Sequence, residues 1–262
     1  MKRIITSQLY QLRRNTMLLR ISLLVAVSMA AMGALVSLTS DGDRSAGGLF
    51  TDSNGLMWIF QIMLIGVMTG IICAGDFGEK DINYELMNGH SRRSIYLARV
   101  ILCVGLASVV AEILAFIPCI SAAAVSGWGE RIKPGDLFAR MGLFIFPFMR
   151  MAAFFSMLSF MIKKQGIVMI LGFAAEMGCI ILNDIVQDKS GYMLSVFNII
   201  KLTDVGDFGL YNVVPGKGVV EYFVCEGALE PSLAAGTVIV SLVMTLIYLA
   251  AGYAFFRKDD LE

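Results

Sequence analysis

Charged residues are scarce in this chain: only 16% of its 262 residues are Asp, Glu, Lys or Arg, whereas 57% are hydrophobic. The mean hydropathy of +0.75 exceeds that of a typical water-soluble domain. The 21 basic and 21 acidic residues give a formal net charge of zero, whereas a nucleic-acid partner would favour a concentrated basic face. The composition therefore predicts an integral membrane protein that does not bind nucleic acid.

Histidine is almost absent, since His90 is the only one, so a histidine-based metal centre or catalytic triad is not expected. A nucleotide-binding loop is also missing. The nearest stretch, VVPGKG, lacks the first glycine of that motif and has Gly218 where Ser or Thr should follow the lysine. The five cysteines show no metal-ligand spacing and are expected to be small buried apolar residues. We therefore expect no enzymatic activity, no metal and no bound cofactor on this chain.

Long apolar runs, in contrast, are abundant. A membrane-spanning helix needs about 20 mostly apolar residues to cross roughly 30 Å of hydrocarbon. Six runs of about that length are bounded by charge or turn residues: 17–39, 56–75, 98–126, 137–162, 166–183 and 235–256. The predicted fold is a single all-α transmembrane domain, residues 1–262, with six transmembrane helices.

The basic residues are sorted by this six-span arrangement. One side receives Lys2, Arg3, Arg13, Arg14, Arg20, Lys80, Arg92, Arg93, Arg99, Lys163, Lys164, Arg257 and Lys258, and the other side receives fewer near the spans. Because Lys and Arg near short loops stay on the cytoplasmic side, both termini are expected to be cytoplasmic. The expected location is the plasma membrane of a bacterium.

The first residues, 1–16, form a separate feature. Within MKRIITSQLYQLRRN, the apolar Ile5, Leu9 and Leu12 share one helical face, and the basic residues lie largely elsewhere. This pattern is typical of an amphipathic helix in the inner headgroup layer. The alternative is a frayed basic leader that only sets the orientation.

The segment 184–234 is too long to be a simple connection between two spans. It contains apolar patches such as YMLSVFNII and a glycine-rich stretch. A loop of this length with apolar content usually packs on the rest of the protein. We expect short helices that fold back over the outer end of the spans.

The most polar segment between two spans is DFGEKDINYELMNGHSRRSIYLAR, which begins at residue 76. Ile82 to Met87 can form a short helix, Asn88 and Gly89 can stop it, and Ser91 can cap the helix that continues into the third span. Because adjacent spans need a shorter connection, residues 76–93 are interpreted as a cytoplasmic elbow that presents a surface to a partner. A merely solvated loop is the alternative.

Three ionisable residues fall inside the apolar runs near mid-depth: Glu112, Arg150 and Glu176. A charge at that depth costs roughly 2.5 to 3.5 kcal/mol on insertion scales, so we expect the three to meet inside the bundle. They are either an ion pair that joins neighbouring helices or part of a transport path. One carboxyl group is expected to carry a proton, since one arginine cannot neutralise two carboxylates.

Small residues recur at four-residue intervals in the first two spans. Gly66 and Gly70 lie in the second span, and Ala26, Ala30 and Ala34 lie in the first. This spacing allows two helices to approach closely. The contact could join two subunits or two helices of one subunit.

Taken together, the elbow with NGHSRRSIYLAR, the ending AGYAFFRKDDLE, the amphipathic start, the long outer segment and the six spans resemble the membrane subunit of type-2 ABC exporters. The resemblance implies a permease that works as a dimer, with a second copy of itself or a homologous permease. Two separate ATPase subunits would bind ATP and magnesium. Among such permeases, the chain looks most like those for antimicrobial or toxin peptides, including lantibiotic immunity and phenol-soluble modulin export.

The same resemblance assigns the elbow as the coupling helix that docks on the ATPase. The residues expected to make this contact are Glu79, Asp81, Glu85, Leu86, Met87, Arg92 and Arg93. Apolar Leu86 and Met87 are the expected anchors, and the charged residues would set the orientation.

Three alternatives remain open at this point. Exporters of this class also move drugs, lipids or polysaccharides. A secondary transporter would instead use an ion gradient through Glu112, Arg150 and Glu176, although no inverted repeat is evident. A membrane scaffold or sensor would use the elbow only as a docking surface.

Overall fold

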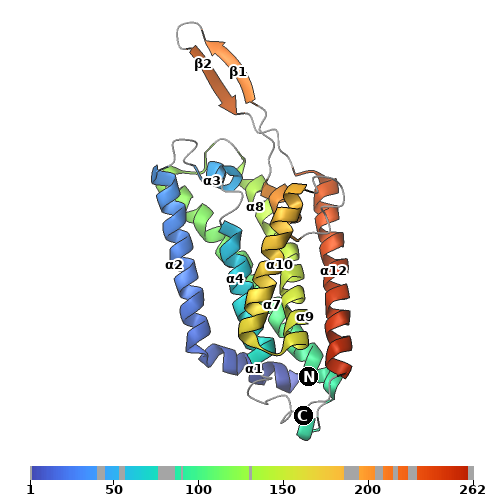
Figure 1. Ribbon diagram of the computed structural model, residues 1–262. Helices are drawn as coiled ribbons and strands as arrows, with labels where there is room; N and C mark the ends of the chain where they lie inside the picture. Colours follow the sequence, from blue (N-terminus) through green and yellow to red (C-terminus); the bar gives the residue numbers. More distant parts are fainter. Residues whose placement is uncertain are drawn as a thin grey trace.

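The computed structural model of this chain describes residues 2–39, 45–52, 57–75, 86–89, 91–129, 132–185, 195–203, 209–214, 218–223 and 229–258. Figure 1 shows a bundle of long helices, with both termini at one end and the short α1 lying across that end. The elements are α1 (Lys2–Arg14), α2 (Thr16–Thr39), α3 (Ala46–Asp52), α4 (Met57–Thr69), the π-helix η1 (Gly70–Ala74), α7 (Arg92–Ser126), α8 (Pro134–Gly142), α9 (Ile145–Ile162), α10 (Gln165–Ile185), α11 (Ser195–Thr203), β1 (Gly209–Val214), β2 (Gly218–Phe223) and α12 (Pro231–Lys258).

Four helical segments of the described chain are long and apolar enough to cross a membrane. They are α2, α7, the α8–α9 segment and α12. The second and fifth predicted spans correspond to shorter apolar helices, Ile59–Ala74 and Gln165–Cys179. The chain is therefore a helical membrane protein, and its described residues include four candidate membrane-spanning helices.

The junction of α1 and α2 explains why α1 lies across the bundle. The Asn15 side chain accepts hydrogen bonds from the backbone N–H groups of Met17 and Leu18, both at 3.1 Å, so it caps the start of α2. The inward face of α1 is Ile4 and Gln8, which are 3% and 5% exposed. Of the three residues that the sequence placed on the apolar face, Ile5 and Leu12 are half-buried and pack against the core, whereas Leu9 is 46% exposed. The residues of α1 that pack against the bundle therefore recur every four positions, starting from Ile4.

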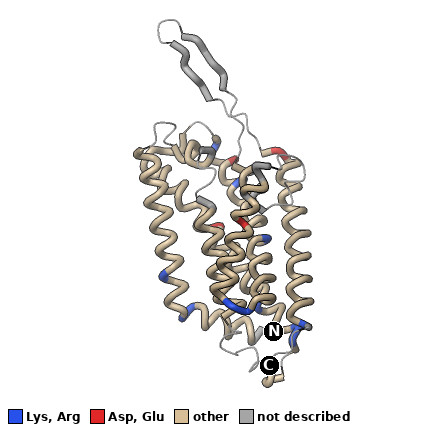
Figure 2. The backbone as a smooth tube through the Cα atoms, in the orientation of Figure 1, with Lys and Arg blue, Asp and Glu red and all other residues tan. Residues whose placement is uncertain are grey.

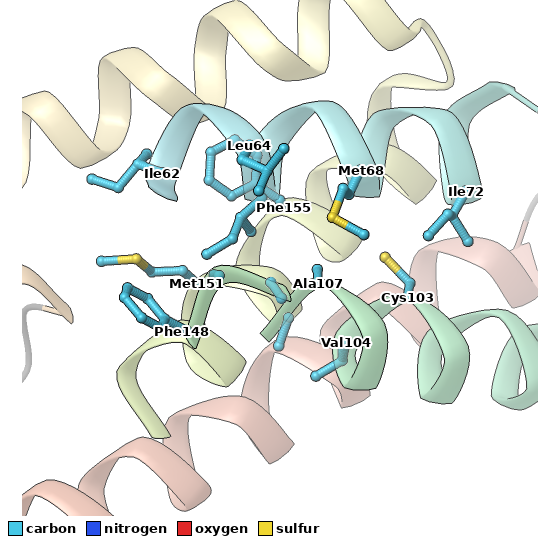
Figure 3. Packing of buried hydrophobic residues seen from close by; sticks show 14 of the residues in the cluster. Ile62, Leu64, Met68, Ile72, Cys103, Val104, Ala107, Phe148, Met151 and Phe155 are labelled. Carbon is cyan, nitrogen blue, oxygen red and sulfur yellow. The ribbon is translucent and has the colours of Figure 1, made fainter. Parts of the chain in front are cut away.

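The core lies between α4, α7 and α9. Buried side chains from these helices and from η1 point toward one another in Figure 3: Ile62, Leu64, Met68, Ile72, Cys103, Val104, Ala107, Phe148, Met151 and Phe155. On α7 the buried residues recur every four positions, from Ile95 through Arg99 to Cys103 and onward. Towards the middle of α7, the side chains on its inner face are small, and Ala107 and Ala111 there are fully buried. This allows α4 and α9 to pack close to it.

Glycines mark the closest helix contacts. A Cβ atom at Gly33 would collide with the carbonyl oxygen of Pro118, so α2 and α7 approach there. Gly66 and Gly70 of the predicted small-residue motif face Phe155 and Gln165 of the same chain, at 2.9 and 3.1 Å from the added Cβ. Both motif glycines therefore serve packing within one subunit.

The end of the bundle opposite the termini is closed by short elements. Arg140 of α8 donates a 3.0 Å hydrogen bond to the Leu202 carbonyl oxygen of α11. Helix α11 also packs against α9, α10 and α12, as expected for a segment that folds back on the spans. Residues 209–214 and 218–223 differ from the expected short helices, because β1 and β2 pair as antiparallel strands with Gly209 opposite Phe223. The remaining parts of the predicted 184–234 segment are only partly within the described residues.

Candidate functional site

The base of the predicted elbow is well defined. The Gly89 N–H donates a 3.0 Å hydrogen bond to the Leu86 carbonyl oxygen, and Gly89 has a φ of +82°, a conformation that favours glycine. Ser91 then caps α7, because its hydroxyl oxygen accepts a 3.3 Å hydrogen bond from the Ser94 N–H. The stop at Asn88–Gly89 and the new start at Ser91 are both as the sequence predicted.

The two predicted anchors of the elbow are in different environments. Met87 is 79% exposed, whereas Leu86 is half-buried and packs against the hydrophobic core. Only Met87 is therefore available to a partner. Three further predicted contact residues, Glu79, Asp81 and Glu85, lie outside the described residues.

Arg92 and Arg93 are the first two residues of α7. Arg93 is exposed, whereas the half-buried Arg92 donates a 3.3 Å hydrogen bond from Nη1 to the Arg257 carbonyl oxygen. This bond joins the start of α7 to the end of α12. In Figure 2, Lys and Arg positions gather at this end of the bundle, which carries both termini, and few charged positions lie in the middle. Arg93 is thus free to contribute to a basic surface, while Arg92 holds two helices together.

An aromatic cluster surrounds Tyr96 in the first turns of α7. It consists of Tyr96, Phe160, Tyr253 and Phe256, with ring centroids 4.8 to 5.9 Å from Tyr96. These side chains come from α7, α9 and α12. The Tyr96 hydroxyl also donates a 2.6 Å hydrogen bond to the Leu249 carbonyl oxygen of α12. The first turns of α7 are therefore fixed to two other helices by ring packing and by a hydrogen bond.

The predicted intramembrane charges form two separate arrangements. Arg150 and Glu176 are 2% and 3% exposed and interact electrostatically. Arg150 also donates a hydrogen bond to the Tyr248 hydroxyl oxygen. This Arg150 cluster joins α9, α10 and α12, so its residues are paired across helices as a buried charge requires.

Glu112 is not paired in the same way. Both carboxyl oxygens are buried, and neither has a hydrogen-bond partner among the described residues. No basic group lies close enough to act on this carboxyl group in the described part of the chain. The structure therefore joins Arg150 with Glu176 and does not join either of them with Glu112.

Sequence reasoning did not identify two polar residues that the structure places at these sites, and it did not predict the burial of a third residue, Arg99. Tyr96 and Tyr248 were not singled out, because a tyrosine in an apolar run gives no signal before its partner helix is known. Arg99 was counted among the basic residues of the cytoplasmic side, yet it is 1% exposed. The sequence spacing could have indicated this burial, because Arg99 lies four residues after Ile95 and four before Cys103 on the buried face of α7.

The described part of the chain contains no cluster of side chains that could bind a metal ion. No group of three or more His, Cys, Asp or Glu side chains lies close enough to hold a metal ion there. The described cysteines, Cys73, Cys103, Cys119 and Cys179, are free thiols.

No family model matches the chain, and no curated protein matches it significantly.

Proposed function

We propose that this chain is the membrane subunit of an ATP-driven exporter, which works as a dimer with separate ATPase subunits. One observation carries the proposal: the exposed Met87 lies five positions before Arg92, the first residue of α7, which is a helix of 35 residues. At 1.5 Å per residue, α7 is about 52 Å long and so exceeds the roughly 30 Å hydrocarbon layer. A partner that displaces the elbow would move α7, above all the part that precedes its internal Pro118.

The contacts at the start of α7 support this mechanism. Because Tyr96 and Arg92 bind main-chain carbonyl groups of α12, and Tyr96 packs on Phe160 of α9, displacement of α7 would also displace α9 and α12. A merely solvated loop would need no such attachment at its base. The ATPase would therefore act on three helices through one docking helix.

The proposal includes six transmembrane helices with cytoplasmic termini. Helix α10 has 21 residues and is about 31 Å long at 1.5 Å per residue, which is enough to cross the hydrocarbon layer. The combined α4 and η1 segment is shorter and would cross with local thinning of the bilayer. The basic residues at the end that carries both termini (Figure 2) support a cytoplasmic position for that end.

The proposed substrates are amphipathic or antimicrobial peptides, and this part rests on the family resemblance alone. Export of a drug, lipid or polysaccharide is the alternative within the same class. ATP and magnesium would bind to the partner ATPase.

A second function, an ion-coupled secondary transporter, is favoured by the Arg150 cluster. A buried carboxylate beside an arginine and a tyrosine inside a membrane bundle is a common feature of ion pathways. The two functions differ in their energy source. An exporter needs a partner ATPase, and a secondary transporter works without ATP.

The test is to purify the chain from its native membrane with its bound partners and to measure ATP turnover and peptide transport. The proposal predicts no turnover by the isolated chain in lipid nanodiscs and turnover by the complex with a soluble ATPase. In vesicles, transport of a labelled amphipathic peptide should need ATP and persist after ionophores remove all ion gradients. Transport that stops with the ionophores and continues without ATP would identify the secondary transporter instead.

A further inference from the structure

Glu112 of α7 is the predicted intramembrane charge that lies outside the Arg150 cluster. Both of its carboxyl oxygens are buried, and neither has a hydrogen-bond partner among the described residues. Glu112 lies fourteen residues before Ser126, the last residue of α7, which is about 21 Å at 1.5 Å per residue, and it lies further still from the start of the helix. A glutamate side chain is far shorter than this, so the carboxyl group cannot reach either end of α7.

Glu112 lies at the border between two sides of α7. On one side, Ser108 and Ala115 are buried in the bundle. On the other side, Val109 and Ile113 are 48% and 58% exposed, which suits contact with lipid tails. The buried carboxyl group therefore lies where the apolar bundle meets the hydrocarbon of the membrane.

The hydroxyl group one turn before Glu112 does not serve this carboxyl group. The Ser108 hydroxyl donates a 2.6 Å hydrogen bond to the Val104 carbonyl oxygen of its own helix. A serine hydroxyl has only one hydrogen to donate. Ser108 therefore does not stabilise a negative charge on Glu112.

The neighbouring helices supply no counter-charge to Glu112 within the described part of the chain. Helix α7 packs against α1, α2, α3, α4, η1, α8, α9 and α12. After Arg20, α2 contains no ionisable residue, and α4 contains none at all. Arg150, the one ionisable residue of α9, interacts with Glu176 and Tyr248 instead. The other ionisable residues of these elements and of α7 are Lys2, Arg3, Tyr10, Arg13 and Arg14 of α1, Asp52 of α3, Cys73 of η1, Arg92, Arg93, Tyr96, Arg99, Cys103 and Cys119 of α7, Asp136 and Arg140 of α8, and Tyr253, Arg257 and Lys258 of α12.

These surroundings affect the two forms of the carboxyl group unequally. An ionised carboxylate that leaves water needs a counter-charge or several hydrogen bonds, and without them its burial costs much more than burial of the neutral acid. Glu176 has its counter-charge in Arg150. Glu112 has neither kind of partner among the described residues, so a bound proton is the means by which its charge is removed.

We propose that Glu112 is a proton-binding site, and that its carboxyl group is the neutral acid at neutral pH. The sequence predicted that one of two intramembrane carboxyl groups carries a proton, and this proposal assigns the proton to Glu112 and the negative charge to Glu176. With this proton, α7 carries no charged side chain between Arg99 and its end at Ser126. The inference rests on the surroundings of Glu112 alone and does not depend on the proposed export function.

The test is infrared spectroscopy of the complete chain in lipid bilayers at neutral pH, with glutamate ¹³C-labelled in its side-chain carboxyl group. A protonated carboxyl group has a C=O stretching band that an ionised carboxylate lacks, and the label separates glutamate from aspartate and from lipid esters. Glu112→Gln and Glu176→Gln are matched variants, because each replaces one carboxyl group with a neutral amide of similar shape. Glu112→Asp is a second variant at the same position, which keeps an acid but removes the label.

The proposal predicts a ¹³C-labelled C=O band of a protonated carboxyl group in the unaltered protein. This band should disappear in Glu112→Gln and in Glu112→Asp, and it should remain in Glu176→Gln. Absence of the band from the unaltered protein, a result that needs no variant, would overturn the proposal. A band that persists in either Glu112 variant, or that disappears in Glu176→Gln, would overturn it as well, because the proton would then be bound elsewhere.

Discussion

The Tyr96 hydroxyl donates a 2.6 Å hydrogen bond to the main-chain carbonyl oxygen of Leu249. The donor belongs to the first turns of α7 and the acceptor to the last part of α12. Residues 153 positions apart in the sequence are therefore fixed to each other in the first turns of α7. The same tyrosine packs on Phe160 and Phe256, so it is the point at which three helices meet.

The Tyr96→Phe variant should be less stable by roughly 0.5 to 1.5 kcal/mol, because it removes the hydrogen bond and keeps the ring contacts. Reversible unfolding in mixed detergent micelles measures this difference. Tyr10→Phe is the matched control, because Tyr10 is 61% exposed on α1. Equal stability of the two variants would show that the bond to Leu249 does not hold α7 and α12 together.

The Gly33→Ala variant should destabilise the bundle by about 1 to 3 kcal/mol, the usual range for overpacking a tight contact. The added methyl group would meet main-chain atoms of Pro118, which cannot rotate away. Gly105→Ala in α7 has no atom within 4 Å of the new Cβ and should be neutral or stabilising, since alanine favours helix. If Gly33→Ala unfolds at the same denaturant concentration as Gly105→Ala, α2 and α7 do not make this close contact.

The Arg150→Ala variant should give a lower yield of folded protein than the double variant Arg150→Ala with Glu176→Gln. The single change leaves the buried Glu176 carboxylate without its arginine, and the second change removes that charge. Size-exclusion chromatography of detergent-extracted protein measures the yield.

Glu112→Gln provides the control for this rescue. The Glu112 carboxyl group does not interact with Arg150 among the contacts of the described residues, so adding this change to Arg150→Ala should restore nothing. Rescue by Glu112→Gln, or no rescue by Glu176→Gln, would contradict the arrangement of the Arg150 cluster.

Sequence patterns predicted the features that depend on neighbouring residues. The stop at Asn88–Gly89 and the cap at Ser91 follow from local backbone preferences, and both are present in the structure. The apolar runs also identified the long helices, because crossing a membrane requires a minimum length of apolar chain.

Features that depend on a distant partner could not be predicted in this way. The sequence marked Glu112, Arg150 and Glu176 as one group by depth alone, but depth does not give the rotation of a helix, which decides that Arg150 meets Glu176 and Tyr248. The close helix contact at Gly33 depends on Pro118, which lies on another helix, so the sequence around Gly33 does not reveal it. The paired strands β1 and β2 lie in a segment whose patchy apolar pattern does not distinguish strands from short helices.

The central claim is that the elbow transmits the work of a partner ATPase to the bundle, and Met87→Asp tests it most directly. Met87 is the exposed anchor, whereas a change at the half-buried Leu86 would also disturb the core. Gln11→Asp is the matched control, because it places the same charge at an exposed position of α1 at the same end of the bundle.

Both variants should be purified with the copurifying ATPase and reconstituted in vesicles, where binding of the ATPase and ATP-dependent transport of a labelled amphipathic peptide are measured. The account predicts that Met87→Asp folds normally but binds the ATPase at least about tenfold more weakly, as loss of one apolar hot spot does, and transports little peptide, while Gln11→Asp keeps both activities. Unchanged ATPase binding and unchanged peptide transport by Met87→Asp would contradict the account.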